Sequence, residues 1–162
     1  MNSVETVSRP GPFNLEAQQS MTRWVSFELA GQQYAVAILK VFEVLASADI
    51  EPVPTAPRGV IGVINLRGSI VTVMDLRNWL GFVPSERQCC ILIVNHESQP
   101  VGFCVDRIIE VLNIAKDAIK PVPSSATQEF APCVSGLVNR NGEILTLLEL
   151  SDLIKNEPAS CH

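Results

Sequence analysis

The side chains best suited to covalent or metal chemistry in this 162-residue chain are its five cysteines. No two of them have the C-x-x-C spacing typical of zinc sites, and the two histidines, His96 and His162, stand near no ligand-like cluster. We therefore expect no metal site and reduced thiols, with Cys104 packed as a small hydrophobic residue in a strand. Adjacent Cys89 and Cys90 leave one alternative open, a small-molecule or redox sensor that uses these thiols and an apolar interior.

Other arrangements that would indicate catalysis are missing from the sequence. No serine lies in a G-x-S-x-G turn, the histidines have no evident acidic partner, and the glycines are spread through hairpins instead of forming a phosphate loop. Acidic residues fall mostly at turns or on the polar faces of strands. We predict a protein that is not an enzyme and needs no cofactor.

Composition limits the classes of partner. The chain is 47% hydrophobic and 18% charged, which is typical of a globular protein with a large buried surface. Its formal net charge of −5 argues against nucleic acid as a partner, because phosphate binding requires a positive field. No apolar run is long enough to insert into a membrane, and we identify no export signal, so a cytoplasmic location is expected.

An internal repeat organises the elements that would position any site. Residues 136–154 repeat the pattern of 62–80, and residues 101–112 repeat that of 34–45. Each half, about 70 residues long, offers about five short strands and a terminal helical turn. The fold class is therefore expected to be mainly all-β, with two small antiparallel barrels that pack on each other because one alone would be marginally stable.

The boundaries follow from this pattern. We expect a flexible N-terminal tail over 1–22, one domain over 23–156 and a C-terminal tail over 157–162. Within the domain, two interleaved barrel halves should cover approximately 23–81 and 89–155. An apolar groove is expected where the halves meet, because duplicated barrels leave a seam and apolar grooves receive helices.

Each half contains a hairpin with a short glycine turn. In the second half the turn is Asn141-Gly142, the strongest short hairpin signal. In the first half Arg67 replaces the asparagine, and a positive φ would cost arginine about 1–2 kcal/mol. We therefore predict a type I turn with only Gly68 in the left-handed region and a bulged hairpin. Asp75 should cap the following helical turn, and Gly81 should end it.

Four segments together resemble the CheW family of bacterial chemotaxis adaptors. They are ILKVFEV (38–44), GVINLRGSIVTVMDLR (62–77), VGFCVDRIIEVL (101–112) and GLVNRNGEILTLLEL (136–150). The resemblance covers roughly residues 23 to 155 and implies two five-stranded SH3-like barrels around a shared apolar core. It also implies a non-enzymatic scaffold that bridges the cytoplasmic helical tip of chemoreceptors to the regulatory domain of a CheA-type histidine kinase, at membrane-associated receptor arrays. Related adaptors serve pilus-motility or surface-sensing systems, and the sequence does not separate these pathways.

The same resemblance implies a set of site residues. The receptor helix would lie in a groove between the barrels, lined by Val25, Ile38, Val41, Val44 and Ile108. For Val25 and Ile38 a plain core position is the strong alternative. Kinase contacts would come mainly from the first barrel.

Arg67 is expected to be functionally sensitive. Its alternatives are a solvent-facing turn charge or a structural pairing with Glu43, and we favour a pairing that also shapes the binding surface.

Overall fold

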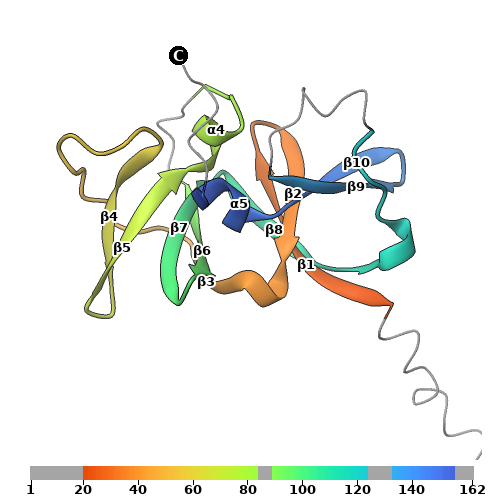
Figure 1. Cartoon of the computed structure of the whole chain (residues 1–162), viewed down its shortest axis with the longest axis horizontal. Helices are drawn as coiled ribbons and strands as arrows, with labels where there is room; N and C mark the ends of the chain where they lie inside the picture. Colours follow the sequence, from red (N-terminus) through yellow and green to blue (C-terminus); the bar gives the residue numbers. More distant parts are fainter. Residues whose placement is uncertain (1–19, 84–88, 124–132, 156–162) are drawn as a thin grey trace, which may run out of the picture.

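The computed structural model describes residues 20–83, 89–123 and 133–155. Of the two predicted tails, only positions 20–22 fall within the described residues. Residues 84–88, in the connector between the halves, also lie outside them. In chain order the elements are β1 (Met21–Leu29), β2 (Gln32–Ala37), the 3-10 turn η1 (Ile38–Lys40), β3 (Val41–Leu45), β4 (Val60–Leu66), β5 (Ser69–Asp75), α4 (Leu76–Trp79), β6 (Cys90–His96), β7 (Gln99–Val105), β8 (Arg107–Ala115), the 3-10 turn η2 (Lys116–Ala118), β9 (Val134–Arg140), β10 (Glu143–Leu148) and α5 (Leu150–Lys155) (Figure 1).

The strands form two five-stranded sheets, and the predicted mainly β fold with two SH3-like barrels is confirmed. Barrel A has the strand order β8-β1-β2-β10-β9, and barrel B has the order β3-β6-β7-β5-β4. The two lie side by side, with barrel B on the left of Figure 1 and barrel A on the right.

The repeats exchange strands to build these barrels. The first repeat supplies β1 to β5 and the second supplies β6 to β10, yet barrel A contains β1 and β2 with β8 to β10. Barrel B contains β6 and β7 with β3 to β5, which is the same arrangement with the repeats interchanged. The strands of different repeats meet in two equivalent parallel pairs, β2 with β10 and β7 with β5. Neither barrel can therefore form from one half of the chain.

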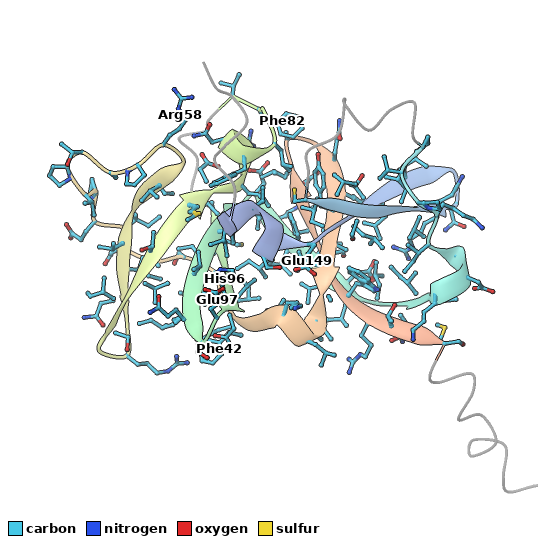
Figure 2. All side chains as sticks on the ribbon, viewed as in Figure 1. Phe42, Arg58, Phe82, His96, Glu97 and Glu149 are labelled. Atoms are coloured by element: carbon cyan, nitrogen blue, oxygen red, sulfur yellow. The ribbon has the colours of Figure 1, made fainter. Side chains whose placement is uncertain are left out.

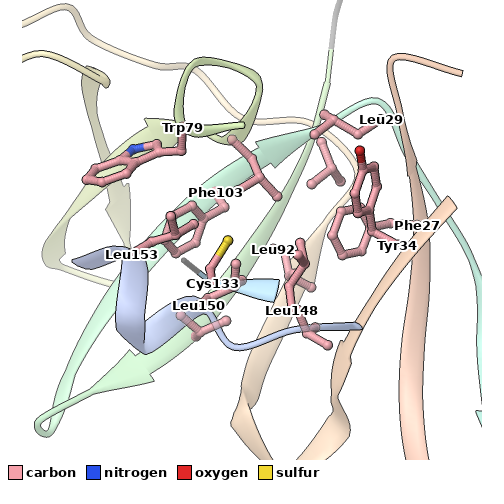
Figure 3. Close-up of a cluster of buried hydrophobic side chains, with 14 of the residues drawn as sticks. Phe27, Leu29, Tyr34, Trp79, Leu92, Phe103, Cys133, Leu148, Leu150 and Leu153 are labelled. Atoms are coloured by element: carbon pink, nitrogen blue, oxygen red, sulfur yellow. The ribbon is translucent and has the colours of Figure 1, made fainter. Parts of the chain in front are cut away.

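Three apolar clusters hold this arrangement together. One fills the interior of barrel A around Leu112, Leu145 and Leu147, and one fills barrel B around Val71, Val73, Ile91 and Ile93. The third lies between the barrels and is the largest; we call it the shared core (Figure 3). Central strands thus bury both faces, which explains why the chain is so rich in apolar residues. The shared core contains Val25, Phe27, Leu29, Tyr34, Val36, Leu76, Trp79, Leu92, Val94, Phe103, Val105, Cys133, Leu148, Leu150 and Leu153.

Helices α4 and α5 are short, and each begins directly after an acidic residue. The Asp75 carboxylate accepts a hydrogen bond from the backbone N–H of Arg77 at 2.9 Å, and Gly81 follows α4 with φ +85°, as predicted. Glu149 accepts a hydrogen bond from the Ser151 N–H at the start of α5. Within the described residues, no helix has the length and hydropathy needed to cross a membrane.

The first hairpin turn corrects one prediction. Arg67 has φ +51° and Gly68 φ +88°, nearly the values of Asn141 and Gly142, so both central residues of each turn are left-handed. Leu66 pairs directly with Ser69, and the bulge lies at the other end of the hairpin, between Val60 and Gly62. The predicted type I turn with a bulge at Gly68 is therefore wrong.

Two side-chain interactions offset the cost of the left-handed arginine. The carboxamide oxygen of Asn65 accepts the Gly68 N–H at 2.8 Å, as the equivalent Asn139 accepts the Gly142 N–H at 3.1 Å. The Arg67 guanidinium in turn donates to Glu43. Asn65 and Asn139 were the sequence signal that both turns have the same left-handed conformation, because each side chain accepts a backbone N–H of its turn.

Candidate functional site

The residues expected to line a groove lie around the shared core at different depths. Val25, on β1, is 5% exposed and belongs to the shared core, so it has almost no surface to offer a partner. Ile38, Val41 and Ile108 are half-buried and pack against that core. Val44 is 39% exposed and does not pack against it.

The repeat explains this gradation. β3 and β8 occupy equivalent edge positions in barrels B and A, which makes Val41 equivalent to Ile108 and Val44 equivalent to Val111. Val111, like Val44, is exposed. We call these four residues the rim. Large buried side chains such as Phe27, Leu92 and Phe103 fill the centre of the seam, so a partner can contact the rim but cannot enter the seam between the barrels.

A second exposed apolar surface lies on barrel B, and the sequence analysis missed it. Leu39 on η1 is 94% exposed, Ile70 at the start of β5 is 67% exposed, and Phe42 on β3 is also exposed. Figure 2 shows Phe42 at the lower edge of barrel B. The signal was weak but present, because Leu39 and Phe42 fall outside the apolar spacing of Ile38, Val41 and Val44.

An ion pair beside this surface joins the two edges of barrel B. Both terminal nitrogens of Arg67, in the β4–β5 turn, donate to one carboxylate oxygen of Glu43 on β3 at 2.7 Å. β3 and β4 are the edge strands of the sheet, so the pair closes the barrel. Phe42 precedes Glu43, and Ile70 follows Arg67 by three positions, so both lie near this closure. We call Phe42 and Ile70 the hairpin end.

A polar joint connects the two barrels on the side of α4. Arg77 makes two hydrogen bonds to the Asp106 carboxylate, and the second oxygen of that carboxylate also accepts the backbone N–H of Ala30 at 2.9 Å. The hydrogen bond to Asp106 raises the pKa of Arg77 above its usual value. Burial raises the pKa of the neighbouring Asp75, although the backbone N–H of Arg77 and its positive charge oppose this shift. The joint fixes the β1–β2 turn of barrel A against α4.

Among the described residues, no group of three side chains is suited to a metal ion. His96, the last residue of β6, has a side chain that is only 15% exposed, and it lies 3.8 Å from Glu97. Cys89 and Cys90 are adjacent but pack on different clusters, Cys89 in barrel B and Cys90 against the shared core. The site is thus made of apolar surfaces and ion pairs, which suit protein recognition better than bond chemistry.

Comparisons with known proteins give this geometry a family context. Residues 23–157 match a protein family described as the CheW-like domain. A chemotaxis protein CheW from Thermotoga maritima is 32% identical over 132 residues, covering 81% of this chain and 86% of the relative. The chemotaxis protein CheW of Helicobacter pylori is 28% identical over 145 residues, covering 88% and 87%. The crystal structure of the scaffolding protein TtCheW from Thermoanaerobacter tengcongensis superposes with a TM-score of 0.76 at 29% identity, covering 86% of this chain and 97% of that one.

Proposed function

The chain belongs to the CheW-like domain family, and from this we propose that it couples chemoreceptors to a CheA-type histidine kinase without enzymatic activity of its own. The resemblance carried by the four sequence segments is confirmed. Membership of this family makes the chain a chemotaxis scaffold, as its relatives and structural neighbour are named. The observation that carries the proposal is the family match over both barrels, together with exposed apolar surfaces in place of a reaction centre.

For the receptor, we propose that one helix of its cytoplasmic tip contacts the rim. A helix presents apolar residues in a stripe, and an edge of exposed valines flanked by half-buried Val41 and Ile108 suits such a stripe. Val44 and Val111 would lose water on binding, while Val41 and Ile108 would extend the contact inward. Val25 and Ile38 would act by supporting the rim from below.

For the kinase, we propose that its regulatory domain contacts the hairpin end of barrel B. The Arg67–Glu43 pair would hold Phe42 and Ile70 in place for that contact, so the pairing would be both structural and part of the interaction surface. Nucleic acid and direct membrane insertion have no part in this function. The protein would act in the cytoplasm at membrane-associated receptor arrays, in flagellar chemotaxis or in a related pilus-motility or surface-sensing pathway.

The test is a binding titration of the full chain against two separate partners, a CheA-type regulatory domain and a soluble receptor-tip fragment. Adaptor interfaces bury modest areas, so both should bind with a Kd no weaker than tens of micromolar. Val44→Asp should weaken receptor binding at least tenfold, equivalent to about 1.4 kcal/mol, and leave kinase binding unchanged. Phe42→Asp should weaken kinase binding at least tenfold and leave receptor binding unchanged.

The matched control is Val53→Asp, because Val53 is 41% exposed, much like Val44, but lies in the proline connector away from both surfaces. This control should bind both partners normally. Val41→Asp and Ile108→Asp should also abolish receptor coupling, but their half-buried positions require a parallel measurement of unfolding. The proposal fails if neither partner binds at tens of micromolar protein, or if Val53→Asp is as damaging as Val44→Asp.

A further inference from the structure

Two cysteines in the interior of barrel B lie close enough to react with each other. The sulfur atoms of Cys89 and Cys104 are 2.6 Å apart, against about 2.05 Å in a disulfide bond. Cys104 on β7 pairs with Ile91 on β6, and Cys89 stands two positions before Ile91, so the two thiols are diagonal neighbours on the same face. Forming the bond would need only a small movement of Cys89, which precedes the first residue of β6.

The adjacent Cys90 does not share this geometry. Successive residues of a strand point to opposite faces, and Cys90 packs against the shared core while Cys89 and Cys104 belong to the interior of barrel B. From the sequence alone, the adjacent Cys89 and Cys90 were the thiols expected to act in a redox sensor. The thiol that Cys89 contacts is instead Cys104, fifteen positions along the chain.

The Cys89–Cys104 pair also has access to small reactants. Both thiols line a cavity of about 70 Å³ beneath the Arg77–Asp106 ion pair, and Cys89 is only half-buried. The close contact between the thiols lowers the pKa of Cys89 and raises that of Cys104, although burial and the carboxylates of Asp75 and Asp106 act against ionisation of Cys89. Because Cys89 is half-buried and Cys104 is buried, Cys89 is the thiol placed to attack first, and Cys104 the one placed to resolve the product.

We propose that Cys89 and Cys104 form a redox-active pair that a hydroperoxide converts into an intramolecular disulfide. Cys89 first releases its proton to water, and the thiolate then attacks one oxygen of hydrogen peroxide; the O–O bond breaks, and the leaving hydroxide takes up one proton from water in place of the one released, so that the net product is water. Cys104 sulfur then attacks the sulfenic sulfur of Cys89, the S–O bond breaks, and the second hydroxide takes the Cys104 proton. Two thiols lose two electrons, and one peroxide is reduced to two waters.

This modification would act at the joint between the barrels. The disulfide would fix the start of β6 to the end of β7, directly before Asp106, whose carboxylate holds Arg77 and the Ala30 N–H. Oxidation would thus restrain the segment that carries the joint. The proposal rests on the position of the thiols and is independent of which partners the scaffold binds.

The experiment uses the full reduced chain and hydrogen peroxide, followed by alkylation of the remaining thiols and digestion without a reductant. Trypsin releases residues 88–107 as one peptide, and cleavage after Glu97 divides it into 88–97, with Cys89 and Cys90, and 98–107, with Cys104. We expect the two pieces to stay linked after peroxide treatment and to separate on reduction. The linked mass should be about 2 Da below the sum of the two pieces with Cys90 alkylated and with Cys89 and Cys104 as free thiols.

Cys90→Ser is the matched control and should keep the link, whereas Cys89→Ser should lose it. Because Cys89 is half-buried, its replacement by serine should leave the fold intact, which a urea unfolding curve of the reduced variant checks. The proposal is overturned if the pieces separate without reduction, if the Cys90→Ser protein loses the link, or if peroxide adds oxygen to Cys89 without joining it to Cys104.

Discussion

Replacing Gly62 with alanine should destabilise the fold much more than the same change at its repeat equivalent, Gly136. A Cβ atom at Gly62 would lie 2.3 Å from the carbonyl oxygen of Glu51 and 2.8 Å from a methyl carbon of Ile50. That carbonyl accepts the Val63 N–H at 2.9 Å, and the Glu51 N–H donates to the Val63 carbonyl at 2.8 Å. The backbone of the connector therefore cannot move away without breaking this bridge.

The cost follows from these contacts. Overpacking costs typically about 1–3 kcal/mol, and each of the two backbone hydrogen bonds contributes about 0.5–1.5 kcal/mol, so Gly62→Ala should cost about 2–6 kcal/mol. At Gly136 the nearest atom is a side-chain methyl of Ile119 at 2.7 Å, with the Lys120 carbonyl at 3.3 Å. A side chain can rotate aside for about 0.5–1.5 kcal/mol.

Urea unfolding measures the difference. With an m-value of about 2 kcal/mol/M, the midpoint of Gly62→Ala should fall by about 1–3 M, and that of Gly136→Ala by about 0.25–0.75 M. Gly68→Ala is the control for a left-handed glycine with open space around it, and should cost about 1 kcal/mol. The reasoning is refuted if Gly136→Ala is as destabilising as Gly62→Ala, or if Gly62→Ala unfolds like the parent.

Two further predictions concern charged groups. In a double-mutant cycle with Glu43→Gln and Arg67→Gln, urea unfolding should give a coupling energy of about 0.5–1 kcal/mol, because Arg67 is largely exposed and water screens the pair; zero coupling would contradict a structural role of the pair. Burial raises the pKa of Asp75, so the folded chain binds the Asp75 proton more tightly than the unfolded chain does. Protonation of Asp75 therefore stabilises the fold fully at low pH, and this stabilisation is lost as the pH rises through the folded-state pKa. Asp75→Asn keeps an acceptor for the Arg77 N–H, and its unfolding midpoint relative to the parent should rise as the pH increases above the ordinary carboxyl pKa of 3.8; a difference that stays constant with pH would contradict this.

The repeat and the strand pattern made most of the fold predictable, because alternation of apolar residues depends only on which faces are buried. The alternation of apolar residues could not predict the exchange of strands between the repeats. β2 has the same two buried faces whether it pairs with a strand of its own repeat or with β10 of the other. Local periodicity therefore fixes each strand but leaves its neighbour undetermined.

The candidate site shows where local rules fail. The positive φ of Arg67 is unfavourable by itself, and contacts from Asn65 and Glu43 outweigh that cost. Likewise, the register of β3 against β6 shifts between Val41 and Glu43, where Phe42 lies. Phe42 is exposed at this irregularity, and the apolar spacing of the sequence gave only a weak indication of its exposure. The contact of Cys89 with Cys104 depends on the same kind of tertiary information, namely the register of β6 on β7.

The position of β3 gives a physical reason why one small domain could serve two partners. This five-residue strand contributes Val41 to the border of the shared core, Val44 to the rim, Glu43 to the closing ion pair and Phe42 to the hairpin end. Its inner side is held by β6, a strand of the other repeat, and Val41 packs against the shared core, so β3 cannot shift without disturbing barrel B and that core. If the rim binds a receptor helix and the hairpin end binds a kinase domain, as we propose, the two partners contact alternate residues of one strand. Coupling between them would then need no moving part within the scaffold, only the fixed spacing that the strand exchange imposes.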